Sequence, residues 1–443
     1  MIGVNWCRRR QRSTWVTWLF TMAGLLLFGS TSCNTPDNLP DALPTQLPVI
    51  SAEGTPGFFD PEEVDTVDTT NRQLVLWASA PFEALLDPET NRTLVTVYEQ
   101  FERNHPGVHI DAQLHAEHGE ASLLNYLRSA QRVAPAILPD IILIDTQELW
   151  QIGDLELLRP FDWESVASNF TFYPFAVSAV TYQEQIVGIP YMTDLTHMVG
   201  YAEQVGELPR TWEAFLTAGQ PLNFVAGKAE NVNEFAYYQY LGAGELLLGD
   251  EPIDTERLLA YFTFLADAQA QNLIPETVLE ITDVTAAWNA FMAAEQGLAE
   301  TSTSVILNHW DAVSNGVVQY GPLPSRTGNT PASTRVWAFI IVASDTQQRE
   351  LSIALLQALL APDVHSQWNR LAMRIPTQPA AFELWRNPAA YYNFVQQQLA
   401  EALSPPSSRR FADLNRRLHY AQELVLRQEM APEEAVLYVQ ATP

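Results

Sequence analysis

The feature that most constrains the fold is a regular alternation of short apolar strands and amphipathic helices that begins after residue 72. Residues 74–78 have the pattern of a strand, residues 89–104 that of a helix, and residues 108–114 that of a second strand. A helix over residues 120–132 then leads to a strand over residues 140–145, whose unbroken apolar middle predicts burial on both faces. Two such units on one sheet predict an α/β fold with a largely parallel sheet.

The remainder of the chain mixes both element types and becomes almost entirely helical in its C-terminal third. A turn-bounded apolar segment is expected at residues 186–191, and strands are expected at residues 304–307 and 337–343. The hydroxyl of Thr211 is suited to cap a helix that begins at Trp212. The helices expected in this part of the chain cover residues 212–219, 234–242, 255–272, 347–360, 379–385, 390–403, 409–427 and 432–439.

Residues 1–32 have the organisation of a secretory signal peptide. Four arginines precede an apolar run over residues 15–28, which is too short to favour a spanning helix. Small residues then lead to Cys33, and this arrangement resembles the lipobox of bacterial lipoproteins. The resemblance implies that Cys33 is lipidated and becomes the first residue of the mature chain. The alternative is an ordinary cleaved signal in which Cys33 is incidental.

Residues 33–72 are expected to form a disordered tether. This segment contains six prolines and eight acidic residues, with no basic residue before Arg72. Such a composition provides little apolar surface to bury and favours an extended chain.

Charge and cysteine content exclude several classes of function. The formal net charge is -28, which disfavours contact with nucleic acid and with anionic lipid headgroups. The second cysteine, Cys7, lies in the expected signal peptide. The mature chain therefore has no intramolecular disulfide, no thiol nucleophile beyond Cys33 and no cysteine-based metal site.

A series of short motifs resembles the bacterial extracellular solute-binding proteins of family 1, which are similar to maltose-binding protein. The resemblance runs from about Gln73 to the end, and it depends on the order of the motifs more than on any single one. The motifs are LVLWAS (74–79), YEQFERNHPGVHI (98–110), PDIILID (139–145), IVGIPY (186–191), LPRTWEAFL (208–216), VQYGPLPSRTG (318–328), WAFIIVAS (337–344), RIPTQ (374–378) and APEEAV (431–436).

The resemblance implies a two-lobed periplasmic-binding-protein-like fold of type II. Each lobe would be a mostly parallel sheet flanked by helices, with a helical C-terminal region. Residues 73–185 and 338–372 would form the N-terminal lobe, and residues 186–337 and 373–443 the C-terminal lobe. The solute would bind in the cleft between them, at the carboxyl ends of the strands.

The function implied is that of the substrate-binding lipoprotein of an ABC importer. The protein would be exported, lipid-anchored at the outer face of the cytoplasmic membrane and monomeric. Its partners would be a small-molecule solute, for which a mono- or oligosaccharide is expected, and the transmembrane permease subunits. The resemblance implies no nucleic acid, no cofactor and no catalysis. Two alternatives remain: a surface glycan hydrolase with two cleft carboxylates, and a binding or sensor module for a non-sugar ligand.

A sugar cleft requires aromatic faces for the CH surfaces and polar groups for the hydroxyls. Suitable residues follow the expected strands, although a buried aromatic residue packs in a core more often than it binds a ligand. Asp145 and Trp310 match ligand-facing loops of the family, whereas Trp212 is assigned to packing. The candidate ligand-binding residues are Trp77, Ser79, Asp145, Thr146, Tyr191, Asp194, Asn308, Trp310, Asp311, Arg335 and Trp337.

Signatures of catalysis and metal binding were sought in the same sequence. His109, Asp111 and His115 would share one face of an extended strand, but an exposed polar face explains the pattern as well, and no metal is expected. The chain lacks G-x-S-x-G, H-E-x-x-H and P-loop motifs, and no catalytic residue is expected.

Overall fold

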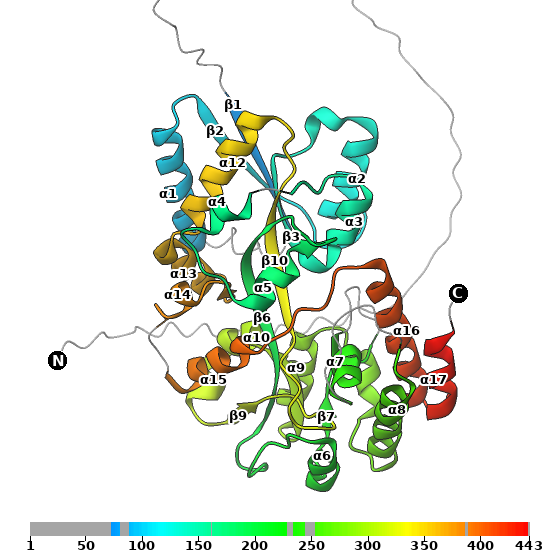
Figure 1. Cartoon of the computed structure of the whole chain (residues 1–443). Coiled ribbons are helices and arrows are strands. Elements are labelled where there is room, and N and C mark those ends of the chain that lie inside the picture. The colour runs from blue at the N-terminus through cyan, green and yellow to red at the C-terminus, as the bar shows by residue number, and fades with distance from the viewer. Residues whose placement is uncertain are drawn as a thin grey trace, which may run out of the picture. The chain divides into compact units, whose positions relative to one another are not determined.

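The computed structural model describes residues 72–79, 88–160, 162–227, 234–243, 253–385 and 389–441 (Figure 1). Cys33, the expected signal peptide and all of the expected tether except Arg72 lie outside these ranges. Within them, no helix has both the length and the apolar character needed to cross a bilayer.

A nine-stranded sheet runs through the described part of the chain. Its main path has the order β2-β1-β3-β10-β6-β8-β7, and β9 and β11 also pair with β6. The strands are β1 (Arg72–Ala78), β2 (Val108–Leu114), β3 (Ile141–Asp145), β6 (Ile189–Tyr201), β7 (Leu222–Asn223), β8 (Leu298–Ser302), β9 (Val318–Gly321), β10 (Thr334–Ile341) and β11 (Ile375–Pro376). A separate ribbon pairs β4 (Thr181–Tyr182) with β5 (Gln185–Ile186).

The expected α/β two-lobed fold is confirmed, but the sheet is mixed rather than mostly parallel. β1 pairs in parallel with β2 and β3, and β7 pairs in parallel with β8. Every pairing of β6 and the pairing of β10 with β3 are antiparallel. The expectation assumed only βα units, whose crossover helices return the chain to the same edge. β10 instead runs opposite to both of its neighbours, β3 and β6, and β6 also runs opposite to β8, β9 and β11.

β6 connects the two parts of the sheet. Its residues as far as Leu195 pair with β10, and its residues from Thr196 onward pair with β8 and β9. We call the part around β1, β2 and β3 the first lobe, and the part around β7, β8 and β9 the second lobe. Figure 1 shows these parts at opposite ends of β6.

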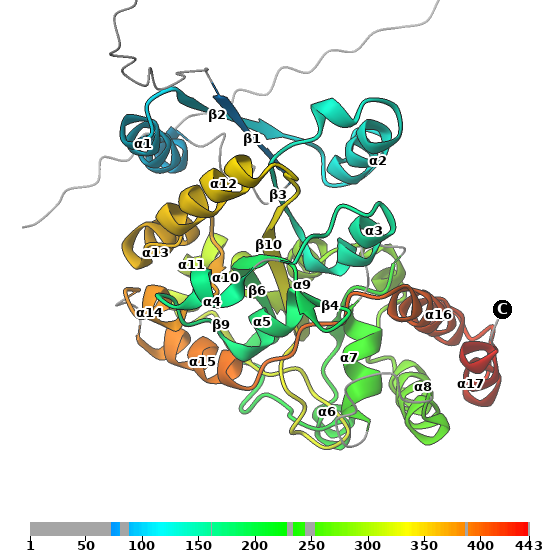
Figure 2. The ribbon, with the colours of Figure 1, turned by 45° about the horizontal axis from the view of Figure 1, so that its top comes forward.

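Helices cover the sheet in both lobes (Figures 1 and 2). The first lobe contains α1 (Pro88–Asn104), α2 (Leu123–Val133), η2 (Pro135–Ile137), η3 (Thr146–Glu148), α3 (Leu149–Asp154), α4 (Trp163–Ala167), α12 (Thr346–Leu359) and α13 (Pro362–Leu371). The second lobe contains α6 (Trp212–Ala218), α7 (Glu234–Gly242), α8 (Thr255–Ala270), η4 (Glu276–Glu280), α9 (Val284–Ala294), α10 (Thr303–Asn308), α11 (Trp310–Ser314), α15 (Ala389–Ala400), α16 (Arg409–Leu426) and α17 (Pro432–Gln440). Helices α5 (Pro174–Ala179) and α14 (Pro379–Phe382) lie beside β6 and β11.

Each lobe has its own hydrophobic core. In the first lobe, the apolar middle of β3 is completely buried, as its sequence predicts. In the second lobe, Phe215, Phe224 and Phe262 are completely buried in a core that also includes α16 and α17. Trp212 stacks on Phe264 in this core at a ring-centroid distance of 4.6 Å, so its assignment to packing is correct.

One expected strand is wrong. Residues 304–307 belong to helix α10, and the strand in this region is β8, which ends at Ser302. The carboxylate of Asp194 accepts hydrogen bonds from the backbone N–H (2.9 Å) and the hydroxyl (2.5 Å) of Ser304. These bonds satisfy a donor that the first turn of a helix leaves open. This tertiary contact outweighs the strand preference of Val305 and Ile306.

Candidate functional site

A cavity of about 220 Å³ lies where β6 and β10 pass between the lobes. Most of its wall belongs to the second lobe, and the rest comes from β6, β10 and the residue before β11. It is lined by Asp194, Thr196, Val225, Glu234, Thr282, Asp283, Val284, Thr285, Glu300, Ser302, Ser304, Arg335, Trp337 and Arg374.

Strand register explains how residues distant in sequence meet at this cavity. Asp145, the last residue of β3, pairs with Trp337 on β10, and Arg335 on β10 pairs with Asp194 on β6. Alternate residues of a strand share a face, and directly paired residues lie on the same face of the sheet. These four side chains therefore point to one side of the sheet.

Arg335 is the centre of an ion-pair cluster beside the cavity. Its Nε donates to Asp145 at 2.5 Å, and its Nη2 donates to Glu117 at 2.6 Å. Burial alone would lower the pKa of Arg335, but the negative charges of Asp145 and Glu117 raise it above its usual value. Burial, with the nearby charge of Asp145, raises the pKa of Glu148 to about 8. Arg335 is thus a permanently charged group that two carboxylates hold in place.

Trp337 is the aromatic residue of the cavity wall. It is 3% exposed, and the guanidinium carbons of Arg335 and Arg374 lie 4.9 Å and 5.6 Å from its ring centroid. Both distances are within the range of a cation–π contact. The buried Nε1 of Trp337 has no hydrogen-bond partner within the described residues. Trp337 thus lines the cavity and carries a buried indole N–H that no described residue satisfies.

The second lobe contributes two carboxylates, Glu300, which is buried, and Glu234, which is half-buried. Glu300 on β8 is 3% exposed and accepts a hydrogen bond from the backbone N–H of Val225 at 2.9 Å. Burial, with the nearby charge of Glu234, raises the pKa of Glu300 to about 8. Glu234 accepts hydrogen bonds from Gln147 (2.7 Å) and Ser333 (2.8 Å), and burial raises its pKa. The bond from Gln147 to Glu234 links the two lobes directly.

Three of the predicted ligand-binding residues line the cavity: Asp194, Arg335 and Trp337. Asp145 is 6% exposed and lies behind them as the partner of Arg335. Thr146, the next residue, is also buried, and its hydroxyl has no hydrogen-bond partner within the described part of the chain.

The other predicted residues lie away from the cavity. Trp77 packs in the first-lobe core against His115, and Tyr191 stacks on His365 at 4.7 Å. Ser79 is buried just after β1. Trp310 packs against Tyr391, and its neighbours Asn308 and Asp311 are exposed. The strand-end pattern therefore identified part of the wall but also selected core aromatic residues.

Several lining residues were not predicted from the sequence, notably Glu300, Glu234, Ser302, Ser304 and Arg374. The sequence signal for Glu300 is weak: it is one acidic residue in the short run Leu298–Ser302. The structure shows that every position of this run is buried. The other four carry no such signal, because only the tertiary fold brings them to the wall.

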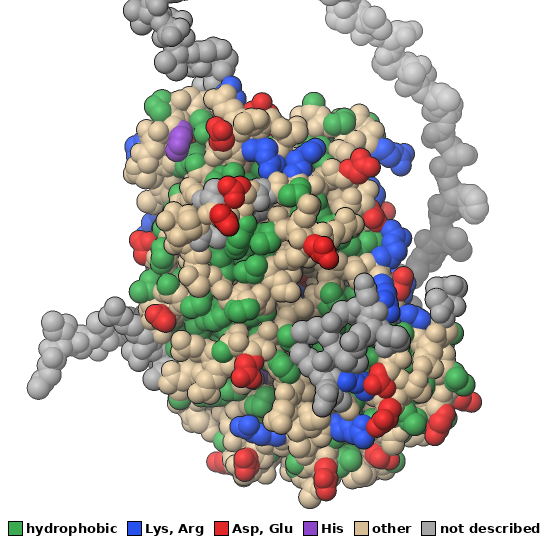
Figure 3. Space-filling model, in the orientation of Figure 1, with side chains coloured by type: hydrophobic (Ala, Val, Ile, Leu, Met, Phe, Trp, Pro, Cys, Tyr) green, Lys and Arg blue, Asp and Glu red, His purple; other side chains and the backbone are tan. Residues whose placement is uncertain are grey.

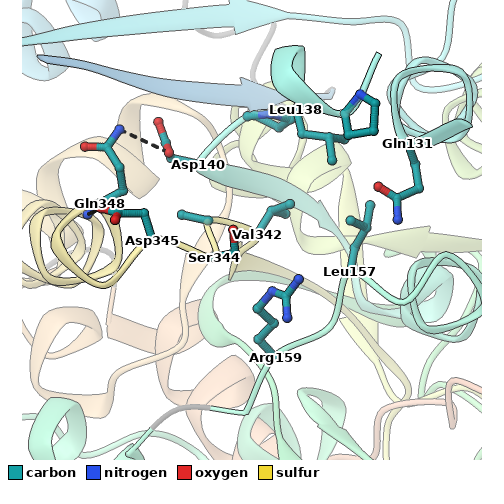
Figure 4. A pocket seen from close by; sticks show the side chains of 12 residues that line it. Gln131, Leu138, Asp140, Leu157, Arg159, Val342, Ser344, Asp345 and Gln348 are labelled. Carbon is teal, nitrogen blue, oxygen red and sulfur yellow. Dashed lines mark hydrogen bonds between the residues drawn. The ribbon is translucent and has the colours of Figure 1, made fainter. Parts of the chain in front are cut away.

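Two larger hollows lie elsewhere, and each is lined by one lobe alone. One of about 300 Å³ is at the opposite end of β3 from Asp145. Figure 4 shows Asp140 and Gln348 there, joined by a hydrogen bond of 3.2 Å, with Arg159 across the hollow. The other, of about 740 Å³, is a groove between α6 and α8. The smaller cavity is the better candidate site because both the strands that connect the lobes and the second lobe line it.

No group of three or more His, Cys, Asp or Glu side chains in the described part of the chain is arranged to hold a metal ion. In the described ranges, the ring of His109 lies 2.9 Å from the carboxylate of Glu102.

Comparison with known proteins decides the family. The model of the family described as bacterial extracellular solute-binding protein matches residues 96–391, which is more than half of the chain. The chain belongs to this family. No curated protein matches the chain.

Solved structures share the fold of this solute-binding protein at low sequence identity. The maltose-bound MalE3 of T. maritima is 18% identical with a TM-score of 0.64, over 83% of this chain and 98% of that one. The cyclic alpha-maltosyl-1,6-maltose binding protein from Arthrobacter globiformis is 15% identical with a TM-score of 0.66, over 83% and 97%. The GacH receptor of Streptomyces glaucescens is 16% identical with a TM-score of 0.63, over 84% and 97%.

Proposed function

We propose that this protein is the lipid-anchored substrate-binding subunit of an ABC importer, and that it binds a carbohydrate between its lobes without turnover. The observation that carries the proposal is the cavity lined both by second-lobe residues and by the strands that connect the lobes. A solute held there would stabilise the lobe arrangement that surrounds it, and a permease could recognise that arrangement.

The chemistry of the wall supports a polyhydroxylated solute. Hydroxyl groups of Thr196, Ser302 and Ser304 line the cavity together with carboxylates and guanidinium groups. These groups offer both donors and acceptors to sugar hydroxyls. The volume of about 220 Å³ is below the roughly 300 Å³ at which drug-sized pockets begin, which favours a solute of one or two sugar rings.

Thermal unfolding with a panel of mono- and oligosaccharides tests the carbohydrate assignment. A ligand at about 100 times its dissociation constant should add about 2.7 kcal/mol to the free energy of unfolding. Trp337→Phe keeps an aromatic ring but removes the indole N–H, so it should weaken the response, whereas Trp310→Phe, away from the cavity, should not. The absence of a shift with every sugar would refute the assignment.

Two further measurements separate this proposal from its alternatives. Release of shorter products from a glycan panel, measured by chromatography, would favour the hydrolase over the receptor. Neighbouring genes for two multi-span permease subunits would support import, and a neighbouring sensor kinase gene would favour sensing.

The lipid anchor is tested separately from the ligand. The substitution Cys33→Ser removes the thiol to which the lipid would be attached. The protein should then leave the membrane fraction. If Cys33→Ser leaves the membrane-bound fraction unchanged, the anchor at Cys33 is ruled out.

A further inference from the structure

Carboxylates outnumber guanidinium groups on the wall of the cavity. Asp194, Glu234, Asp283 and Glu300 face two basic residues, Arg335 and Arg374. The charge of Arg335 is already balanced, because Asp145 and Glu117 each accept a hydrogen bond from it. The formal charge left at the cavity is therefore negative.

Two of these carboxylates are in a costly position. Glu300 is 3% exposed, and its one described hydrogen bond comes from the backbone N–H of Val225. Glu234 receives hydrogen bonds from two neutral groups, Gln147 and Ser333. Neither carboxylate forms an ion pair within the described residues, although the nearby charge of Arg335 partly offsets the rise in the pKa of Glu234. A buried carboxylate without a paired cation is disfavoured in its charged form. Desolvation accordingly raises the pKa of both groups.

The cavity offers little aromatic surface on which a sugar ring could stack. Its one aromatic lining residue, Trp337, is 3% exposed and already has two guanidinium groups within cation–π range. What Trp337 does offer is its buried indole N–H, which has no partner within the described residues. That donor requires an acceptor oxygen on the ligand.

We propose that the solute is a small polyol with a protonated amine, such as an amino sugar, whose ammonium group binds between Glu300, Glu234 and Asp283 while a hydroxyl oxygen accepts from Trp337. The inference rests on the proposed solute-binding function and specifies the class of solute. The ammonium group supplies the positive charge that the buried carboxylates lack, and the hydroxyl groups meet the serine and threonine side chains of the wall.

Binding of such a cation has a measurable consequence. A positive charge beside Glu300 favours its ionised form, so Glu300 loses a proton when the solute binds. The dissociation constant should then fall as the pH rises, by up to tenfold per pH unit, over the range in which the free amine is still protonated and Glu300 of the free protein is still neutral. A neutral sugar should show no proton release and little dependence on pH.

Isothermal titration calorimetry of the mature protein with matched solutes tests the inference. The pairs are glucosamine with glucose, and 1-amino-1-deoxysorbitol with sorbitol; glucuronate serves as the anionic counterpart. Within at least one pair, the amine should bind at least tenfold more tightly than its neutral partner. Repeating the titration in buffers with different ionisation enthalpies should reveal release of about one proton.

Variants identify the groups responsible. Glu300→Gln and Asp283→Asn should each weaken binding of the amine about tenfold or more, and Glu300→Gln should abolish proton release. Asn is as good a helix cap as Asp, so Asp283→Asn preserves the N-terminus of α9. The exposed Glu203, in the turn after β6, provides the matched control Glu203→Gln.

The outcomes are distinguishable. Equal or tighter binding of the neutral sugar, or a preference for glucuronate, overturns the cationic solute but leaves the carbohydrate receptor intact. No binding of either amine overturns the cationic solute. The carbohydrate receptor is overturned only if the wider panel of mono- and oligosaccharides gives no thermal shift either.

Discussion

At the scale of single residues, Glu300 is the most unusual side chain in this protein. It lies in the middle of β8, with buried residues on both sides in the strand. A buried carboxylate at such a position lowers stability unless it stays protonated or acquires a cation. Buried ionisable groups that are not needed for packing are characteristic of functional sites.

Glu300 should make the stability of the ligand-free protein depend on pH. Burial raises the pKa of Glu300 to about 8 in the folded chain, from the usual 4.5. The folded state therefore keeps a proton that the unfolded state loses, so the free energy of unfolding falls as the pH rises from about 4.5 to 8. Each pKa unit corresponds to about 1.4 kcal/mol, so Glu300 should account for a loss on the order of 5 kcal/mol.

Chemical denaturation of the ligand-free protein across this pH range measures the effect. Glu300→Gln stays neutral and should give a flatter profile, whereas Glu203→Gln should follow the unchanged protein. If Glu300→Gln loses stability with pH as steeply as the unchanged protein, Glu300 is not the group that titrates.

Single residues also show what sequence alone could predict about the site. Asp194, Arg335 and Trp337 were identified because they lie near the ends of apolar segments, where α/β folds place ligands. Trp77 satisfied the same criterion but lies in the first-lobe core. Both faces of β1 are covered in the region of Trp77, so alternation along the strand does not reveal which side chain faces the cavity.

At the scale of elements, local signals were sufficient where the chain caps its own helix. Thr211 Oγ1 accepts a hydrogen bond from Ala214 N at 3.1 Å, and α6 ends at Gly219 in the left-handed conformation with φ of 64°. Both features are readable from sequence. α10 was mistaken for a strand because its first turn is held by Asp194, more than a hundred residues earlier in the chain.

Removal of the cap of α6 should destabilise the protein by about 1 kcal/mol. Thr211→Ala leaves the backbone N–H of Ala214 without its acceptor, and urea denaturation measures the loss. The matched control is Thr217→Ala, at an exposed position within the same helix. It should be neutral or stabilising by a few tenths of a kcal/mol, because alanine has the higher helix propensity. Equal effects of the two changes would contradict the capping role.

At the scale of the whole described chain, the lobes are connected by more than β6 and β10. Ser407, just before α16, accepts a hydrogen bond from Trp150 N at 3.0 Å and donates to Gln147 O at 3.2 Å. Arg409 forms an ion pair of 2.6 Å with Asp154, and its guanidinium carbon lies 5.1 Å from the centroid of the Trp150 ring. These contacts hold the second-lobe helix α16 against α3 of the first lobe.

The exact lobe boundaries stay a prediction. Residues 73–185 with 338–372, and 186–337 with 373–443, were proposed from the family resemblance. The change of partners in β6 at Leu195 and Thr196 favours placing the first passage inside this strand. Sequence could not locate this point, because β6 is one continuous strand that is mostly buried on both sides of it.

Charged side chains of both signs are scattered over the face shown in Figure 3. On this face the basic residues do not gather into the patch that a nucleic-acid-binding face presents. The charges on this face therefore act mainly as individual ion pairs and less as one broad electrostatic field.

The ion pair of Arg409 with Asp154 should contribute to ligand affinity more clearly than to stability. Both side chains are at least half exposed, so Arg409→Ala should change the free energy of unfolding by less than about 1 kcal/mol. The pair exists only while α16 lies against α3, so its loss favours arrangements in which the lobes are further apart. A ligand that needs the observed arrangement should then bind up to about fivefold more weakly.

Ligand titration calorimetry on Arg409→Ala, Asp154→Ala and the double variant gives the coupling free energy of the two side chains in ligand binding. Small-angle scattering of the ligand-free variants should show a larger radius of gyration than that of the unchanged protein. Arg416→Ala removes a comparably exposed ion pair that lies within α16 alone, and it should alter neither quantity. If the effects of Arg409→Ala and Asp154→Ala on affinity simply add, the contact does not act as a unit. The preference for the observed lobe arrangement must then come from β6, β10, the hydrogen bonds of Ser407 and the bond between Gln147 and Glu234.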